Sequence, residues 1–140
     1  MCKLLQRLSD PSRSGVYRAD AFDAIEDALR GSGADVSRIS LREAQTKDEL
    51  LERLGKTMAF PAWFGGNWDA AEDCLADLSW REGQGHVLLF CEAQPSEDLG
   101  VLVDVLRSSA EFWRERGTPF FAVFVDPGRR LRLPELYRPR

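Results

Sequence analysis

Four carboxylates lie close together in one short stretch of the sequence, FPAWFGGNWDAAEDCLADL, at residues 60–78. Asp69, Asp73 and Asp77 are spaced four residues apart, and Glu72 follows Asp69 by three, so a helix would display all of them on one face. No lysine or arginine interrupts the stretch. Carboxylates grouped in this way can bind a basic partner, coordinate Mg²⁺ or perform acid–base catalysis.

Catalysis by these acids would need more than the stretch itself provides. Carboxylates act as acid and base only where a pocket separates their pKa values, and Mg²⁺ needs further oxygen ligands from other elements. Acids aligned along one convex helix supply neither, and the chain contains no GxSxG, P-loop, HExxH or GxGxxG motif. A small metal-dependent hydrolase that uses the same carboxylates is an alternative hypothesis, but we predict no catalytic residue and no metal ligand.

The distribution of charge favours a protein partner. The chain has 19 lysines and arginines against 23 aspartates and glutamates, and the whole excess of −4 lies within residues 60–78. An acidic patch repels phosphates, which argues against nucleic-acid binding and for a basic partner. A solvated acidic face is the simpler alternative. The stretch differs from an ordinary charged helix because Trp63 and Phe64 precede its glycine turn, and aromatic side chains beside charge are typical of binding hot spots.

Other residues limit the chemistry further. The three cysteines, Cys2, Cys74 and Cys91, are widely spaced, so we expect reduced thiols rather than disulfides or a zinc site. The single histidine, His86, is expected as a strand-edge residue with no role. No apolar run approaches the roughly 20 residues of a membrane span, and the N-terminus does not resemble a secretory signal, which favours a cytoplasmic protein.

Hydrophobic periodicity predicts the elements that must position the acidic stretch. Strands are expected at 14–20, 34–41, 85–92 and 120–125, and helices at 20–31, 47–56, 68–78 and 96–117. We expect Asp20 to cap the first of these helices and a Thr46–Glu49 capping box to start the second. Alternating strands and helices predict an α/β domain with a single layer of about three to four mostly parallel strands flanked by helices.

We expect one domain over residues 1–140, with its core at about 34–126. Residues 1–33 are expected to open with a mobile segment and then to add an edge strand and a helix that covers it. The arginine- and proline-rich residues 127–140 are expected to form a solvated tail.

Local signals place the start of the acidic helix. Gly65 and Gly66 permit a tight turn, and Asn67 is a good N-cap, so the helix should begin at Trp68. Its docking stripe is expected to consist of Trp68, Ala71, Leu75 and Leu78. Cys74 is expected to be a packing thiol, because neighbouring carboxylates would raise its pKa.

Residues 60–78 resemble the signature of barstar-like proteins, which are intracellular inhibitors of barnase-type ribonucleases. The similarity lies in an aromatic pair, a Gly-x-Asn turn, an Asp-Ala step and an Asp-Cys-Leu step, and it extends more weakly over about residues 34–125. The resemblance implies a protein that is not an enzyme, needs no cofactor and acts as an immunity protein or antitoxin. Its implied partner is an extracellular-type, barnase-like ribonuclease or a related basic nuclease toxin, without nucleic acid or membrane.

The resemblance also implies roles for single residues. Asp73 would be the central anchor that enters the basic active site of the nuclease, where substrate phosphate would otherwise lie, with Asp69 supporting it. Trp63 would contact the nuclease, Asn67 would lie in the binding turn, and Ala76 would meet the partner one turn further on.

Two positions depart from the family pattern. Glu72 stands where the family has a tryptophan, and the acidic residue of the family's long helix falls at Phe112, with Glu111 beside it. The expected interface is therefore more acidic and less aromatic. It comprises Trp63, Asn67, Asp69, Glu72, Asp73, Ala76 and Glu111. An adaptor for a basic protein other than a nuclease is a further alternative.

Overall fold

The chain forms a layer of parallel strands between two groups of helices. In the computed structural model, which describes residues 3–137, the strands are β1 (Gly15–Ala19), β2 (Asp35–Ser40), β3 (His86–Cys91) and β4 (Phe120–Val125). The helices are α1 (Lys3–Leu8), α2 (Asp23–Leu29), α3 (Lys47–Met58), α4 (Trp68–Asp77) and α5 (Glu97–Glu115), with a short 3-10 turn at Pro11–Arg13.

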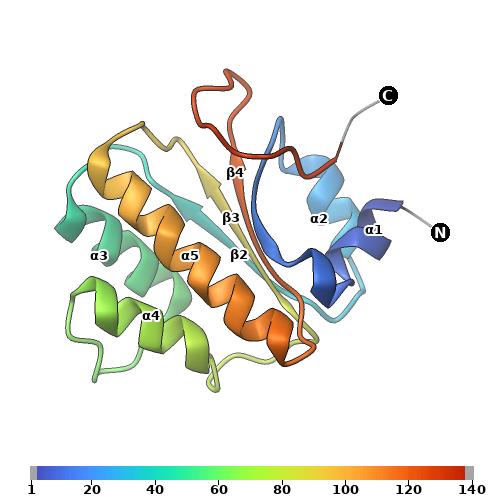
Figure 1. Cartoon of the computed structure of the whole chain (residues 1–140), viewed down its shortest axis with the longest axis horizontal. Coiled ribbons are helices and arrows are strands. Elements are labelled where there is room, and N and C mark those ends of the chain that lie inside the picture. The colour runs from blue at the N-terminus through green and yellow to red at the C-terminus, as the bar shows by residue number, and fades with distance from the viewer. Residues whose placement is uncertain (1–2, 138–140) are drawn as a thin grey trace.

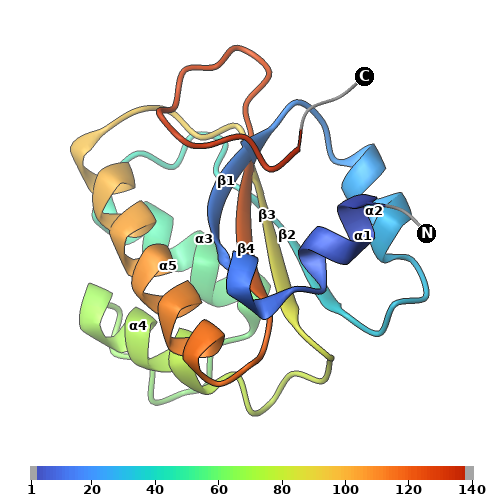
Figure 2. The same cartoon turned by 45° about the vertical axis from the view of Figure 1, so that its right-hand side comes forward.

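The strand order is β1-β4-β3-β2, and all neighbouring strands are parallel. Helices α3, α4 and α5 lie on one side of the sheet (Figure 1), and the turned view places α1 and α2 on the other side (Figure 2). The predicted α/β class with a layer of parallel strands flanked by helices is confirmed.

A buried cluster on each face of the sheet holds the layers together. Successive side chains of a strand point to opposite faces, so β3 and β4 supply both clusters. Phe90 and Phe124, paired in the sheet register, stack on the side of α3 and α5 with ring centroids 4.6 Å apart. Leu89 and Val123 face α1 and α2. This double burial explains why β3 and β4 are continuous apolar runs in the sequence.

The helix starts follow the predictions in α3 but not in α2. The hydroxyl of Thr46 accepts a hydrogen bond from the backbone N–H of Glu49, whose carboxylate accepts one from the N–H of Thr46, so the capping box is confirmed. The prediction that Asp20 caps a helix is wrong, because α2 begins at Asp23 without a side-chain cap. Asp20 instead pairs with Arg18, whose buried guanidinium needs a counter-charge.

The predicted mobile opening is wrong for the residues from Lys3 onward. These residues form α1, which buries Leu4 and Leu8 in the same cluster as Ile25 of α2. A six-residue helix gives too little periodicity to be recognised in a sequence. The expected edge strand is confirmed: β1 lies at the edge beside β4, and helices cover the adjoining face.

The predicted solvated tail is wrong for the end of this segment, although Arg129, Arg130 and Arg132 are exposed as expected. Leu136 is fully buried, and its N–H donates to the carbonyl of Arg18 at 3.0 Å. The N–H of Arg18 donates to the carbonyl of Pro134 at 2.8 Å, and the Arg18 guanidinium pairs with Glu135 at 2.8 Å. The segment packs here because the edge strand offers unpaired backbone groups and a buried cation. Residues 138–140 of the predicted tail lie outside the described residues.

Two of the cysteines carry free thiols, Cys74 and Cys91, as expected, and Cys2 lies outside the described residues. None of the helices within residues 3–137 is both long and apolar enough to cross a membrane.

Replacing Leu136 with alanine tests the packing of the C-terminal segment. We expect Leu136→Ala to lower the free energy of unfolding by about 2–4 kcal/mol, because it empties a fully buried site. Urea denaturation would measure the loss. Leu133→Ala, at a partly buried position of the same segment, is the matched control and should cost less. Equal stability of both variants and the parent would show that the segment does not pack in solution.

Candidate protein-binding surface

Helix α4 starts where a glycine turn and a side-chain cap meet. Gly66 has a φ of +70°, a conformation that favours glycine, and the chain then extends through Asn67. The side-chain oxygen of Asn67 accepts a hydrogen bond from the backbone N–H of Ala70 at 2.7 Å. The predicted N-cap and the start of the helix at Trp68 are confirmed. Asn67 therefore acts first on local structure, by fixing the turn before the acidic helix.

One face of α4 is buried and the opposite face carries its acids. Ala71, Cys74 and Leu75 are fully buried. The C-cap residue Leu78, about one turn further on, is buried as well. The predicted stripe is thus confirmed, with Trp68 packed against it as a partly buried residue. Turning these side chains inward turns the carboxylates outward. We call the four acids of α4 the acidic face: Asp69, Glu72, Asp73 and Asp77.

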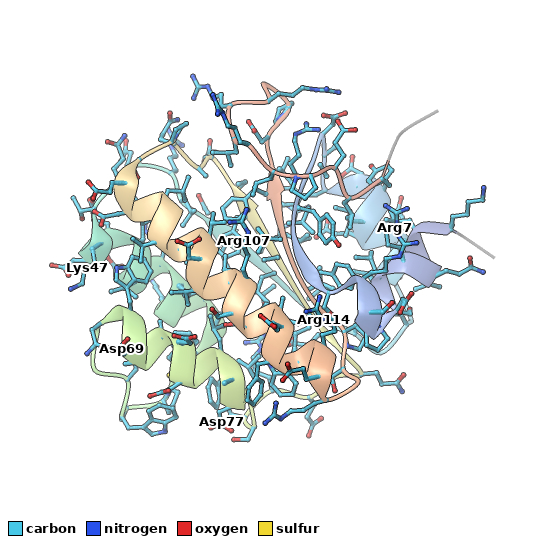
Figure 3. All side chains as sticks on the ribbon, viewed as in Figure 1. Arg7, Lys47, Asp69, Asp77, Arg107 and Arg114 are labelled. Atoms are coloured by element: carbon cyan, nitrogen blue, oxygen red, sulfur yellow. The ribbon has the colours of Figure 1, made fainter. Side chains whose placement is uncertain are left out.

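The acidic face has no counter-charge within the described chain. Among residues 3–137, no side-chain hydrogen bond or ion pair engages any of its four carboxylates. Asp69, Asp73 and Asp77 are exposed, and Glu72 is half-buried. Figure 3 shows Asp69 and Asp77 at the two ends of α4, whereas Arg107 and Arg114 lie on the side of α5 away from it.

Both of these arginines are occupied within their own helix. Arg107 pairs with Asp104 at 3.5 Å, and Arg114 lies 3.8 Å from Glu111. Neutralisation of the acidic face by arginines would have contradicted a binding role, and no arginine within residues 3–137 pairs with these acids.

A shallow groove joins α4 to the C-terminal half of α5. Its volume is about 270 Å³, and it brings together three of the predicted residues, Glu72, Ala76 and Glu111. Phe112 also lines it, and the Arg116 guanidinium lies 3.5 Å from the centre of its ring. The groove therefore places the Glu111 carboxylate of α5 beside Glu72 of the acidic face, with the Arg116 cation close by.

Glu115 lines the same groove and was missed by the sequence analysis. Its spacing of four residues from Glu111 on a predicted helix is the signal that could have found it.

The two aromatic residues before the turn have different positions. Trp63 is the one large hydrophobic side chain within residues 3–137 that is exposed, at 55%. Phe64 packs edge-on against Phe60 at 4.9 Å and also contacts the hydrophobic core, so it helps to hold the loop. Only Trp63 is thus available to a partner. An exposed tryptophan beside unpaired carboxylates is a combination common at protein interfaces.

The geometry supports the interpretation of Cys74 as a packing thiol. Burial raises the pKa of Cys74 to about 11, with further increases from the nearby charges of Asp73 and Asp77. The thiol is therefore protonated and inaccessible at neutral pH, which excludes it as a nucleophile in this conformation.

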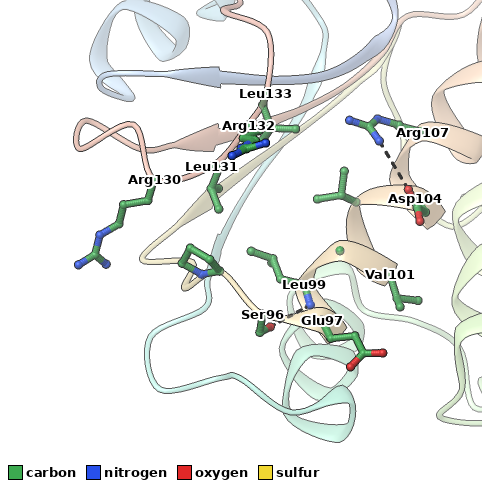
Figure 4. A pocket seen from close by; sticks show the side chains of 13 residues that line it. Ser96, Glu97, Leu99, Val101, Asp104, Arg107, Arg130, Leu131, Arg132 and Leu133 are labelled. Carbon is green, nitrogen blue, oxygen red and sulfur yellow. Dashed lines mark hydrogen bonds and ion pairs between the residues drawn. The ribbon is translucent and has the colours of Figure 1, made fainter.

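A larger groove lies elsewhere on the described chain. It has a volume of about 580 Å³ and runs between the first half of α5 and residues 130–133, with Leu99, Leu131 and Leu133 among its apolar lining (Figure 4). It contains none of the residues predicted for the interface. In residues 3–137, no group of three or more His, Cys, Asp or Glu side chains is placed to hold a metal ion.

Removing charge from the acidic face should stabilise the fold. Asp77 lies in the last turn of α4, at the negative end of the helix dipole and four residues after Asp73. We expect Asp77→Asn to raise the free energy of unfolding by about 0.5 kcal/mol at low ionic strength, with a smaller gain at high salt. Urea denaturation at two salt concentrations would measure it. Asp104→Asn, which removes a paired carboxylate, is the control and should give no gain.

Comparison with known proteins identifies the family. The chain has no match among curated proteins. A family model described as "Barstar (barnase inhibitor)" matches residues 34–125, which is also the range over which the sequence suggested the likeness. The matched range begins just before β2 and ends with β4, so it contains α4 and α5 with the whole acidic face. This range covers more than half of the chain, and the protein therefore belongs to the barstar family.

Proposed function

We propose that this protein inhibits a barnase-type ribonuclease by placing its acidic face in the basic active site of that enzyme. One observation carries the proposal: within residues 3–137, the carboxylates of α4 have no partner although the helix that bears them is firmly anchored. Membership of the barstar family supports the same conclusion from independent evidence.

The physical basis is a substitution of carboxylate for phosphate. A site that cleaves RNA binds the backbone phosphates with cationic side chains. Carboxylates on a rigid helix can accept the same charge-assisted hydrogen bonds, and their combined field accelerates the approach of a basic partner. Because the helix is ordered before binding, little conformational entropy is lost on association.

The positions of the side chains suggest a division of roles. Asp73 occupies the middle of the exposed row, so we assign it the central anchor, and Asp69 supports it one turn earlier. Trp63 would contact the rim of the nuclease. Glu72 and Glu111 face one groove and would bind cationic groups beside the active site.

The two other predicted residues act through shape. Asn67 fixes the turn through its cap, and Ala76 leaves room in the groove for a side chain of the partner.

We further propose that the protein acts in the cytoplasm as an immunity protein or antitoxin and has no catalytic activity of its own. An inhibitor must be present where unprotected RNA would be cleaved. Free thiols at Cys74 and Cys91 suit a reducing compartment. The proposed partner is an extracellular-type ribonuclease or a related basic nuclease toxin, rather than nucleic acid or a membrane.

Loss of the central carboxylate tests this function. We expect Asp73→Ala to weaken inhibition of the captured nuclease by more than about 30-fold, as for a hot-spot residue, and we expect the affinity of the parent to fall as salt rises. Pull-down from cell extract and secretions would supply the nuclease, and RNA cleavage would be the readout. Asp23→Ala removes an exposed acid from α2 and is the charge-matched control.

Capture of a protein without ribonuclease activity would favour an adaptor instead. A complex indifferent to both salt and Asp73→Ala would remove the basis of the proposal.

The metal-dependent hydrolase makes an opposite prediction. Calorimetric titration of the protein with Mg²⁺ and Mn²⁺ should give no heat of specific binding if α4 is a binding surface. Micromolar binding that Asp73→Ala abolishes would instead establish a metal site on these acids.

A further inference from the structure

A buried polar cluster lies behind the C-terminal end of α4. Arg81 follows the helix in a tight turn, where its N–H donates to the carbonyl of Leu78 at 3.0 Å. Its guanidinium donates to both carboxylate oxygens of Asp35 on β2, at 2.6 and 2.8 Å, and to the hydroxyl of Ser37 at 2.7 Å. The Arg81 and Asp35 side chains are only 18% and 11% exposed. A bidentate arginine–carboxylate pair of this kind fixes the relative orientation of the two side chains as well as their distance.

His86 completes the cluster and corrects a prediction. It is the first residue of β3, but it is buried, and its Nδ1 lies 2.9 Å from a carboxylate oxygen of Asp35. It is therefore not simply a strand-edge residue. Burial by itself would raise the pKa of Asp35, yet hydrogen bonds and charge from Arg81 and His86 bring that pKa below its ordinary value. Asp35 is thus ionised at neutral pH and holds both partners.

Three side chains connect this cluster to the ends of helices. The guanidinium of Arg81 donates to the carbonyl of Met58, the last residue of α3, at 3.2 Å, and the indole N–H of Trp80 donates to the same carbonyl at 3.0 Å. The indole N–H of Trp113 on α5 donates to the carbonyl of Leu75 at 2.7 Å, and the Trp113 ring packs against His86 at 5.3 Å.

The carbonyl of Leu75 belongs to the last turn of α4, where carbonyl groups lack partners inside the helix. The Trp113 bond therefore satisfies an otherwise unpaired group and ties α4 to α5.

We propose that Arg81, held by Asp35, and Trp113 are positioning residues. They fix the C-terminal half of α4 and so set the orientation of the acidic face. Helix α4 has ten residues, too few to be stable alone, and its outward charges repel one another. Its buried stripe is narrow, with Leu75 the only large side chain that α4 buries completely. Because this narrow stripe alone would define the orientation of α4 only loosely, the polar contacts of Arg81 and Trp113 at its C-terminal end are needed to fix it.

The buried thiol of Cys74 offers a direct test, since it becomes reactive only when α4 moves. In a background with Cys2→Ser and Cys91→Ser, Arg81→Met should accelerate iodoacetamide labelling of Cys74 at least about tenfold. The reason is that the hydrogen bonds from Arg81 to Asp35 and to the carbonyl of Met58 are lost, so the end of α4 opens more often. Arg38→Met, which breaks the exposed ion pair with Glu26, is the matched control and should leave the rate unchanged.

Global destabilisation is separated from local release by urea denaturation of the same variants. The inference requires that the labelling rate of Cys74 rise by a larger factor than the equilibrium constant of global unfolding does. An unchanged rate, or one that only follows the loss of global stability, would overturn it. Trp113→Phe, which keeps the ring against His86 and removes the bond to Leu75, is a milder variant that should accelerate labelling about threefold.

The consequence for affinity rests on the proposed function, but the labelling experiment needs no partner. If Arg81→Met releases Cys74 and a captured nuclease dissociates faster from the variant, both proposals hold. If the thiol is released and no basic nuclease binds the parent protein, only the inhibitor function fails. If the nuclease binds and the thiol stays protected, only the positioning role fails.

Discussion

Like-charge repulsion along α4 is the constraint on which the other features of this surface depend. Four carboxylates without a counter-ion in the described chain push the helix toward disorder, so it must be held by contacts on its other sides. The N-terminal end is held by the Gly66 turn and the Asn67 cap, and the inner face by a narrow apolar stripe. The C-terminal end is held by a bond from another helix. Each anchor leaves the acids untouched, which is what a binding surface requires.

The sheet provides the rigid support for these anchors. Because β3 and β4 are buried on both faces, they demand helices on both sides, and residues 34–125 supply only those on the side of α4. The elements outside the family match cover the second face: α1, α2 and Leu136 pack there, and β1 extends the sheet at its edge. The extensions thus complete the core without approaching the acidic face (Figure 2). Fold support and partner binding are separated in space.

Local signals in the sequence were sufficient for most of this architecture. The Thr46 box and the Asn67 cap depend on residues within one turn, and both are found where they were predicted. The tail and His86 were mispredicted because their partners are distant in sequence. Asp20 pairs with the buried Arg18 only two residues away, but Glu135 reaches the same arginine from the far end of the chain, and Leu136 fills a site under the edge strand. Such pairings depend on which strand lies at the edge, and a single sequence does not contain that information.

In the candidate site, too, local sequence predicts some features, whereas others depend on residues distant in the chain. The composition of the acidic face follows from spacing alone, whereas its proposed alignment depends on Arg81 and Asp35, which are 46 residues apart in the chain. Since Glu72 lies on α4 while Glu111 and Glu115 lie on α5, the negative surface spans two helices and works as one unit only if their relative position is fixed. Trp113 sets that position, because it joins α5 to the last turn of α4 a few residues from these acids. The acids that would bind the partner and the residues that hold the two helices together therefore lie close to one another on α4 and α5.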